Sequence, residues 1–392
     1  MDSKQKSAVT VSGAALALSC LLAEYGWPLR VPTGKMTPSE LWNCPDDLLA
    51  ALMKLPQREL HRLTAFRKSF SAANVLEELE RKQVAMVGLG QAGYPACLAQ
   101  IHDPPAAIFL KEPSAQAASG RPGDAANGLP EDAASGRPGN AANRLPEDAA
   151  SGRPGNAANS GYGNASLDRL AALMKRPRVA IVGARSASDY GVDAATNIAR
   201  GLARHGVCVV SGLALGIDAA AHRGSVTEEG SSIAVLGCGV DVVYPRGNRA
   251  LYSNLVEHGL VISEYPPGTS PIAWRFPARN RIMAGLSDAV IVVEARARSG
   301  ALITADFCLE EGRDVFAVPG SIFSELSIGP HKLLRLGAAA VTCAEDVLDN
   351  LGIEPDQQRL PLEDARPPAD LTEEEKRLFL ACLLYTSPSP RD

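Results

Sequence analysis

The chain has 392 residues, of which 46% are hydrophobic and 21% charged, and these proportions exclude a wholly disordered protein. At roughly 150 residues per domain, the length allows two or three domains. The formal net charge of −5 excludes a protein covered in positive charge, although a local basic surface is enough to bind nucleic acid.

Ala8 to Ala23 predicts an ordinary N-terminal helix. Lysines before this apolar run imitate a secretory signal, but small and polar residues interrupt it and no clean cleavage site follows. No apolar run reaches the roughly 20 residues of a membrane helix, so we expect no membrane-spanning segment. The eight cysteines contain no C-x-x-C pair, and the nearest two, Cys20 and Cys44, are 24 residues apart. This spacing predicts no metal or redox site and favours a reducing, cytoplasmic location.

Residues 1–82 are predicted to form a small helical domain. Thr37-Pro38-Ser39-Glu40 has the form of a capped helix start, and leucines recur at helical spacing from Leu48 to Leu79. Short strands are predicted at Val84–Val87 and Ala107–Leu110, and we group residues 83–112 with the domain that follows the repeats described next.

Gly88 to Gly93, after the first of these strands, fits the pattern G-x-G-x-x-G of dinucleotide-binding proteins. That function needs a helix opening at the loop. Pro95 follows at once, and Asp103-Pro104-Pro105 leaves no length for a crossover helix. We therefore interpret the motif as a turn and expect no cofactor.

A repeat of 16 residues follows: Ser119–Ala134 and Ser135–Ala150 are near-copies, and a third copy fades after Asn159. Each unit offers one leucine and no aromatic residue, so stacked copies could not bury a core. Residues 113–160 are therefore predicted to be a disordered insertion. The host domain can tolerate it because the entropy of loop closure grows only logarithmically with length.

Residues 161–351 alternate apolar strands, glycine-rich turns and amphipathic helices. This pattern predicts a doubly wound α/β domain with a mostly parallel sheet covered on both faces. Helices are expected at Asp193–His205 and Ala301–Glu311. Strands are expected at Val179–Val182, Val207–Val210, Ser232–Leu236, Leu260–Ser263, Ala289–Val293, Val315–Val318 and, more weakly, Ala339–Thr342.

Residues 352–392 are predicted to be a polar linker followed by a truncated helix. Leu371 opens a helical pattern that runs to Leu384 and stops in a short tail rich in serine and proline. That tail is too short to complete another domain, which suggests a truncation.

Several glycine-rich turns stand at the carboxyl ends of predicted strands, where open α/β sheets bind their ligands. Glycine lets the backbone approach a phosphate, and the amide groups of the following helix supply donors and partial positive charge. Together the turns predict an anionic ligand. They are Val182–Arg185, Ser211–Asp218, Leu236–Gly239 and Ser299–Thr304.

The segment Trp274 to Ile282 carries Arg279, Asn280 and Arg281 beside aromatic rings. Guanidinium groups can bind phosphates, and rings can stack on bases. Between Pro271 and Thr304 there are five arginines against two acids, so the local charge is positive. The alternative, equally weighted from these residues alone, is that Arg279 and Arg281 pair with Glu264 or Glu294.

Common catalytic signatures are absent: the chain has no G-x-x-x-x-G-K-[ST], no H-E-x-x-H and no G-x-S-x-G. Asp218 and His222 lie four residues apart on a predicted helix, a spacing that suits a metal or an acid–base pair. The structural interpretation, a carboxylate at the helix start and a histidine paired locally, is favoured over it. We predict no catalytic and no metal-binding residue.

Taken together, these motifs resemble the DNA-processing protein A family, also called DprA or Smf. The resemblance covers most of the chain outside the repeat, with Tyr94-Pro95 and Asp103-Pro104-Pro105 as a lead-in. The segments that carry it are VAIVGAR at 179–185, SGLALGIDAAAH at 211–222, AVLGCGVDVVYP at 234–245, ISEYPPG at 262–268, FPARNRIMAGLS at 276–287, SGALITA at 299–305 and VFAVPG at 315–320.

The resemblance implies an extended Rossmann-like domain that binds single-stranded DNA, forms a homodimer and helps load a RecA-type recombinase in natural transformation and DNA recombination. It implies no enzymatic activity. The helix opening at Leu371 resembles the start of the winged-helix domain of many members, and the repeats depart from the family pattern. The DNA-binding residues it implies are Gly183, Arg185, Ser211, Gly212, Gly216, Arg279, Asn280, Arg281, Ser299, Gly300 and Thr304.

Two alternatives belong to other functional classes. The first is an enzyme resembling the phosphoribohydrolases that cleave nucleoside monophosphates on a related fold. Those enzymes carry Pro-Gly-Gly-x-Gly-Thr where this chain has Ser299–Thr304, and Glu294 has no second carboxylate to work with. The second is an interaction scaffold built around the repeat.

Overall fold

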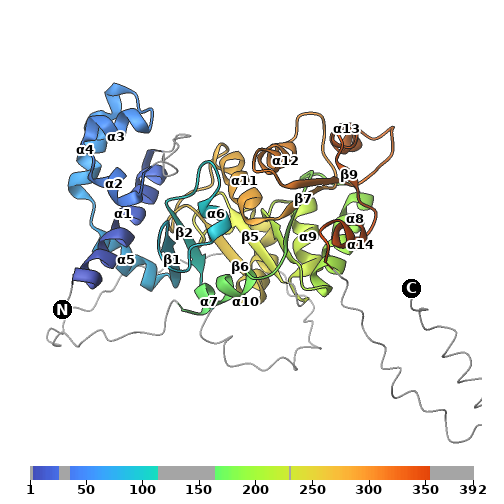
Figure 1. The fold of residues 1–392 in the computed structure, drawn as a ribbon, viewed down its shortest axis with the longest axis horizontal. Helices are drawn as coiled ribbons and strands as arrows, with labels where there is room; N and C mark the ends of the chain where they lie inside the picture. The colour runs from blue at the N-terminus through green and yellow to red at the C-terminus, as the bar shows by residue number, and fades with distance from the viewer. Residues whose placement is uncertain (1–2, 26–35, 114–163, 229–230, 354–392) are drawn as a thin grey trace, which may run out of the picture. The chain divides into compact units, whose positions relative to one another are not determined.

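The computed structural model describes residues 3–25, 36–113, 164–228 and 231–353 (Figure 1). The predicted disordered insertion beyond Pro113 and the helix expected from Leu371 lie outside these ranges. The described residues up to Ala344 belong to one compact unit and Glu345 begins a second, so a domain boundary at residue 82 stays a prediction. In these ranges no helix is both long and apolar enough to cross a membrane.

The N-terminal third of the described chain contains mainly helices, and the remainder alternates strands and helices. The helices are α1 (Ser3–Tyr25), α2 (Pro38–Asn43), α3 (Asp46–Leu52), α4 (Leu60–Ser69), α5 (Ala72–Arg81), α6 (Ala96–Ala99), α7 (Asn164–Leu173), α8 (Asp189–Arg204), α9 (Ile217–Ser225), α10 (Arg249–His258), α11 (Arg275–Leu286), α12 (Gly300–Glu310), α13 (Ile328–Arg335) and α14 (Ala344–Asn350), with short 3-10 turns η1 (Gln57–Glu59), η3 (Arg246–Asn248) and η4 (Glu325–Ser327). The strands are β1 (Val84–Gly88), β2 (Ala107–Lys111), β3 (Arg178–Val182), β4 (Cys208–Ser211), β5 (Ser232–Leu236), β6 (Leu260–Ser263), β7 (Ala289–Val292), β8 (Asp314–Ala317) and β9 (Ala339–Ala340).

The N-terminal helices form where the sequence predicts them. The capping box of α2 is confirmed: the Glu40 amide donates to Thr37 Oγ1 at 3.2 Å, and the Thr37 amide donates to Glu40 Oε2 at 2.8 Å. Leucines of α1 to α4 form one apolar cluster that also contains Tyr265, from the loop after β6. The helices thus pack on one another and on the α/β part of the chain.

The strands pair in the order β1-β2-β6-β5-β4-β3-β7-β8-β9. β1–β2 and β2–β6 are antiparallel, and every other neighbouring pair is parallel. Each predicted strand is present, with bounds shifted by no more than two residues. The central strands β3, β5 and β7 are buried throughout and, apart from Arg178 and Ser232 at their first positions, apolar, because helices cover both faces of the sheet. The predicted doubly wound, mostly parallel α/β fold is confirmed.

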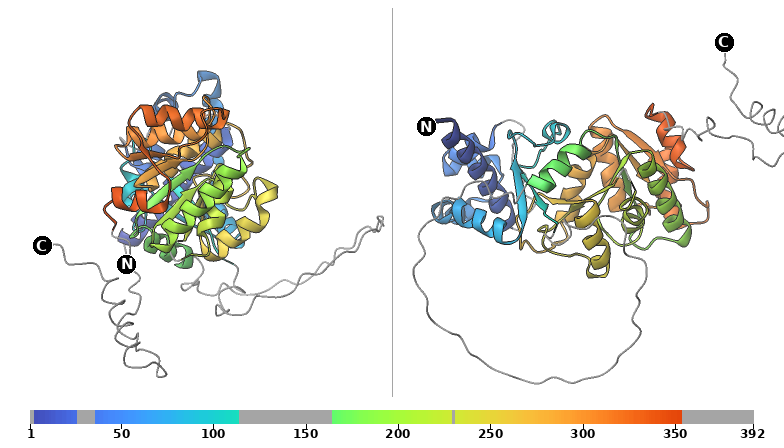
Figure 2. Two further views of the ribbon diagram at one scale, coloured as in Figure 1. Left: turned by 90° about the vertical axis from the view of Figure 1, so that its right-hand side faces the viewer. Right: turned by 90° about the horizontal axis from the view of Figure 1, so that it is seen from below.

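Helices lie on both faces of the sheet (Figures 1 and 2), and alternate residues of its central strands belong to different apolar clusters. Val182 and Val292 belong to a cluster that contains residues of α11 and α12. Ala234, Leu236 and Val261 belong to another, which contains residues of α9 and α10. This alternation is the two-residue period of a strand.

The direction of winding changes at β3. From β3 the chain proceeds outward through β4, β5 and β6, and then returns to place β7 on the other side of β3. The helix α8 after β3 packs on α9, whereas α12 after β7 packs on α11, in the opposite layer. The two loops separate at this point and leave a crevice outside the carboxyl ends of β3 and β7.

The G-x-G-x-x-G motif forms a turn, as expected. Gly90 and Gly93 have φ values of 85° and 91°, and the next helix, α6, has only four residues. β1 pairs with β2 in antiparallel fashion, so no crossover helix connects them. The motif therefore lacks the helix N-terminus that would bind a pyrophosphate.

Candidate nucleic-acid interface

A cavity of about 400 Å³ occupies the crevice outside β3 and β7. The loops after β3, β4 and β7 contribute to it, together with α11 and α12. It therefore lies where doubly wound sheets bind their ligands. The predicted site residues that line it are Gly183, Arg185, Arg279, Asn280, Ser299, Gly300 and Thr304.

The N-terminus of α12 forms one wall of the cavity. Ser299 caps the helix, its Oγ accepting from the Ala301 amide at 3.3 Å. The Thr304 side chain is fully buried, and its Oγ1 has no hydrogen-bond partner among the described residues. A Cβ added at Gly300 would meet no atom within 4 Å. Open space, a free hydroxyl and a helix N-terminus together suit an anion.

Exposed arginines surround this wall. Arg185 is exposed, and its Cζ lies 5.5 Å from the centre of the Phe276 ring. Arg296 and Arg298 are also exposed and line the cavity. Arg296 lies 3.7 Å from Glu325, but both side chains are more than two-thirds exposed, so this pair is weak.

Sequence reasoning did not name Arg296 and Arg298 as site residues. The signal that was available is their position immediately before the Ser299-Gly300 cap, at the carboxyl end of an apolar strand. A charge in that position is directed toward the ligand edge of the sheet.

Arg279 lies beneath the cavity rather than on its rim. It is 4% exposed, and its Nη1 donates to the Gly212 carbonyl at 2.8 Å and to the Val235 carbonyl. Gly212 leaves room for this group, because an added Cβ would lie 2.2 Å from Arg279 Nη1 and would force the guanidinium to move. Burial lowers the pKa of Arg279, and the nearby Asp218 opposes this shift. Arg279 therefore supplies a buried charge, and Asn280 beside it links α11 to α12 by donating to the Gly300 carbonyl at 3.1 Å.

Three further predicted residues shape the rim by packing. Ser211 is fully buried, and its Oγ donates to the Ile181 carbonyl at 2.6 Å. Gly216 has a φ of 75°, and a Cβ there would lie 2.2 Å from the Ala184 carbonyl oxygen. A Cβ on Gly183 would lie 2.6 Å from Ile217. These residues hold the loops after β3 and β4 close together.

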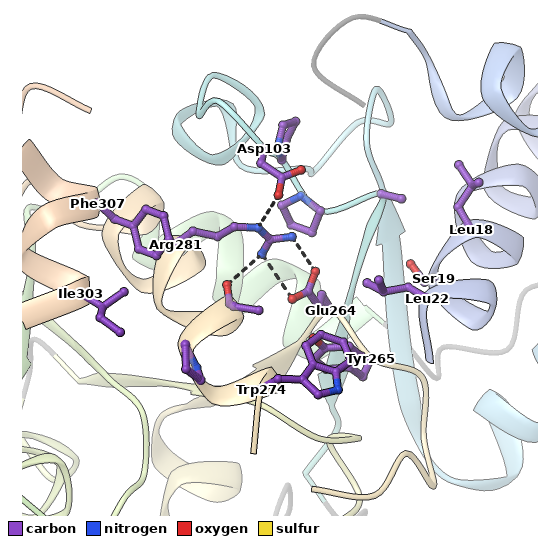
Figure 3. A pocket seen from close by; sticks show the side chains of 15 residues that line it. Leu18, Ser19, Leu22, Asp103, Glu264, Tyr265, Trp274, Arg281, Ile303 and Phe307 are labelled. Carbon is purple, nitrogen blue, oxygen red and sulfur yellow. Dashed lines mark hydrogen bonds and ion pairs between the residues drawn. The ribbon is translucent and has the colours of Figure 1, made fainter. Parts of the chain in front are cut away.

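Arg281 does not lie with the other predicted residues. It lines a second cavity, of about 340 Å³, on the other side of α11 (Figure 3). Its Nη2 lies 2.6 Å from Glu264 Oε2 and its Nε lies 3.2 Å from Asp103 Oδ2. Burial raises the pKa of Glu264 and the Arg281 charge opposes that shift, while the two carboxylates raise the pKa of Arg281.

The expectation that Arg279 and Arg281 share one surface is therefore wrong. Arg281 forms the pairing with Glu264 that the sequence left open as an alternative. Glu294 forms no ion pair with either arginine. Its carboxylate instead accepts from the Ser188 amide at 2.9 Å and from the Ser188 hydroxyl. A third arginine of the basic segment, Arg275, is 2% exposed and donates to the Ala23 carbonyl at 2.9 Å.

Asp218 and His222 both form hydrogen bonds within the fold, but Asp218 also lines the cavity and does not cap α9, whose N-cap is Gly216. Asp218 Oδ2 accepts from the amides of Gly212 and Ala214 at 3.2 and 3.4 Å, and His222 Nδ1 lies 2.7 Å from Ser232 Oγ. Burial raises the pKa of Asp218 against the opposing charge of Arg279. The described part of the chain contains no group of three side chains able to hold a metal.

Comparisons with protein families and with known protein sequences find relatives of one kind. A family model described as DNA recombination-mediator protein A matches residues 169–352. The chain is 51% identical over 176 residues to DNA processing protein DprA of Streptococcus pneumoniae, and 43% identical over 182 residues to DNA processing protein DprA of Bacillus subtilis. These matches cover 45% and 46% of this chain and 62% and 61% of the two relatives, less than two thirds of each.

A solved structure extends the likeness beyond the α/β domain. The X-ray structure of DNA processing protein A from Streptococcus pneumoniae matches with a TM-score of 0.60 and 31% identity. The match covers 87% of this chain and 95% of the other. It therefore includes the N-terminal helices as well as the Rossmann-like sheet, and the chain belongs to the DprA/Smf family of DNA processing proteins.

Proposed function

We propose that this chain binds single-stranded DNA at the cavity outside β3 and β7. The observation that carries the proposal is the wall formed by α12. There the Thr304 hydroxyl, which has no hydrogen-bond partner in the described part of the chain, and the open position at Gly300 lie beside Arg298. A phosphate would be held by the helix N-terminus and by the exposed guanidinium groups of Arg185, Arg296 and Arg298. The ring of Phe276 would stack on a base without selecting its identity.

The proposal predicts strongly salt-dependent binding, because each neutralised phosphate releases counterions. For single strands the slope of log K against log salt is about −0.7 per phosphate. Replacing Arg185 and Arg298 with alanine should therefore weaken binding and make the slope shallower by about 1.4. Fluorescence anisotropy with a labelled oligothymidylate at several salt concentrations measures both quantities.

A matched control removes two exposed arginines elsewhere. Arg58 and Arg204 are 81% and 63% exposed and lie outside the cavity, so Arg58→Ala with Arg204→Ala makes the same change in net charge. If the two double variants lost the same affinity, the weaker binding would be explained by the change in net charge and not by the cavity. Unchanged affinity and slope in Arg185→Ala with Arg298→Ala would refute the proposed interface.

The protein is proposed to act by binding rather than by catalysis. The phosphoribohydrolase alternative needs an available carboxylate at the cavity. Asp218 lines the cavity but is 5% exposed and accepts from two backbone amides, and Glu294 is 4% exposed and is bonded to Ser188. Release of free base from nucleoside monophosphates incubated with the protein would contradict this part of the proposal.

The family description as a recombination mediator supports a wider role. We propose that the chain acts as a homodimer in the cytoplasm and transfers its bound strand to a RecA-type recombinase during DNA uptake and recombination. The expected result is faster recombinase filament formation on strands coated with single-strand binding protein when this chain is added. Light scattering coupled to gel filtration tests the dimer independently.

A further inference from the structure

An exposed tyrosine continues the aromatic surface beyond the cavity. The ring of Tyr244 lies 5.3 Å from that of Phe276, centre to centre, with 36° between the ring planes. Tyr244 is 40% exposed. Phe276 in turn contacts the Arg185 guanidinium. Three flat groups therefore follow one another from the cavity rim to Tyr244.

Phe276 packs closely on the turn after β5, at Gly237. A Cβ added at Gly237 would lie 3.1 Å from Phe276 Cδ1 and 3.3 Å from the backbone of Arg275. The turn after β5 thus supports the ring from behind.

Two exposed arginines follow Tyr244 closely in the chain. Arg246 and Arg249 are exposed, and among the described residues neither guanidinium group has an ion-pair or hydrogen-bond partner. Both lie at the N-terminal end of α10, where the helix dipole disfavours a positive charge. Their charges therefore do not stabilise α10 and remain available to an external anion.

Asn248 attaches the turn η3 (Arg246–Asn248) to the rim of the cavity. Its Nδ2 donates to the carbonyl oxygens of Leu213 and Ala214 at 3.0 and 3.2 Å, and Ala214 lines the cavity. Asn248 is 6% exposed, so the attachment is buried. Tyr244, Arg246 and Arg249 are thereby held next to the loop after β4.

We propose that Tyr244, Arg246 and Arg249, together called the Tyr244 surface, extend the path of single-stranded DNA beyond the cavity. The base after the one on Phe276 stacks on Tyr244, and the next phosphates contact the two arginines. Alternating rings and cations suit an unpaired strand, because each nucleotide offers one flat face and one negative charge. This inference rests on the proposed function.

The test measures affinity against strand length. Oligothymidylates of about 4 to about 16 nucleotides are titrated against the wild-type protein and against Tyr244→Ala, Tyr244→Phe, and Arg246→Ala with Arg249→Ala. The shortest strand, which the cavity accommodates, should bind every variant equally. Longer strands should bind Tyr244→Ala about 5- to 100-fold more weakly than wild type, whereas Tyr244→Phe retains the ring and should bind normally.

The outcomes separate the inference from the function on which it rests. If the wild-type protein binds no single strand of any length, both fail. If it binds but Tyr244→Ala and the double arginine variant follow the wild-type length dependence, the Tyr244 surface alone is refuted. Equal weakening at every length would also refute it, since Tyr244 would then act only by supporting Phe276.

Discussion

One buried guanidinium group depends on the absence of a single methyl group. Arg279 fits against the backbone at Gly212, and the carboxylate of Asp218 lies beneath the same loop. Gly212→Ala would force the guanidinium away and leave the buried carboxylate without its opposing charge. We expect the free energy of unfolding to fall by about 3 kcal/mol, measured by urea denaturation.

Gly300→Ala is the matched control, because its added Cβ meets open space. Its stability should stay within about 0.5 kcal/mol of wild type. Equal stability of Gly212→Ala and Gly300→Ala would show that Arg279 is not held as described.

His222 makes stability depend on pH. Burial and the Arg279 charge lower the pKa of His222 to about 3 from an ordinary value of 6.5. Between these values the unfolded chain binds a proton that the folded chain does not, so stability falls as pH falls below 6.5. From pH 7.5 to 5.5 this group should remove about 1.4 kcal/mol.

Comparison with His222→Gln isolates that contribution, because all other groups titrate alike in both proteins. The unfolding free energy of the variant should fall by less than that of wild type over the same pH range. Identical pH dependence in the two proteins would exclude the lowered pKa.

At the scale of elements, α12 carries a hydroxyl group that we expect to help DNA binding without helping the stability of the fold. Its buried Thr304 hydroxyl has no partner in the described chain, so the folded state gains nothing from it. Thr304→Val should leave stability unchanged or raise it by about 1 kcal/mol, while lowering affinity for single-stranded DNA about tenfold. Thermal unfolding and anisotropy titrations check the two effects.

Thr304→Ser is the matched control, since it keeps the hydroxyl and should retain binding. Weaker binding in the serine variant equal to that of Thr304→Val would mean that the methyl group, and not the hydroxyl, is what matters.

The elements themselves were predictable from the sequence. Strands such as β5 (Ser232–Leu236) are short, apolar and bounded by turn residues, and burial on both faces requires that composition. The glycine-rich turns also pointed to the edge of the sheet at which the cavity lies, because the carboxyl end of a strand is readable from chain direction alone. The sequence could not show which acidic group each arginine pairs with.

Arg281 illustrates the limit. Its partner Asp103 is 178 residues away along the chain, and no local pattern indicates that they meet. Arg275, Arg279 and Arg281 all count as positive charge in the sequence, yet all three are buried or paired, and the exposed charge comes from Arg296 and Arg298. Burial is a property of tertiary packing, so a local count of charges overestimates the basic surface.

At the scale of the whole molecule, the chain between β2 and α7 contains the segment that carries the repeats, while the sheet itself is continuous. The two flanks are joined across this segment: the Ser166 amide donates to Glu112 Oε2 at 3.2 Å, and the Ser166 hydroxyl donates to the same carboxylate. Glu112 is 8% and Ser166 2% exposed. The chain therefore leaves and re-enters the fold at neighbouring points.

Replacing residues 115–162 with a short glycine–serine linker should preserve the fold and the affinity for single-stranded DNA. Closure entropy changes only with the logarithm of length, so the melting temperature should stay the same or rise slightly. Differential scanning calorimetry and the oligothymidylate titration measure the result. Loss of DNA binding in a folded variant would favour the scaffold alternative.

The hydrogen bonds between Ser166 and Glu112 also identify a site at which another protein can be inserted. Since both ends of the intervening chain emerge side by side, a fluorescent reporter whose own termini are adjacent can be spliced there in place of the native stretch. Its emission would follow this chain in living cells without a tag at either terminus, and the cavity at the far end of β3 would stay unobstructed.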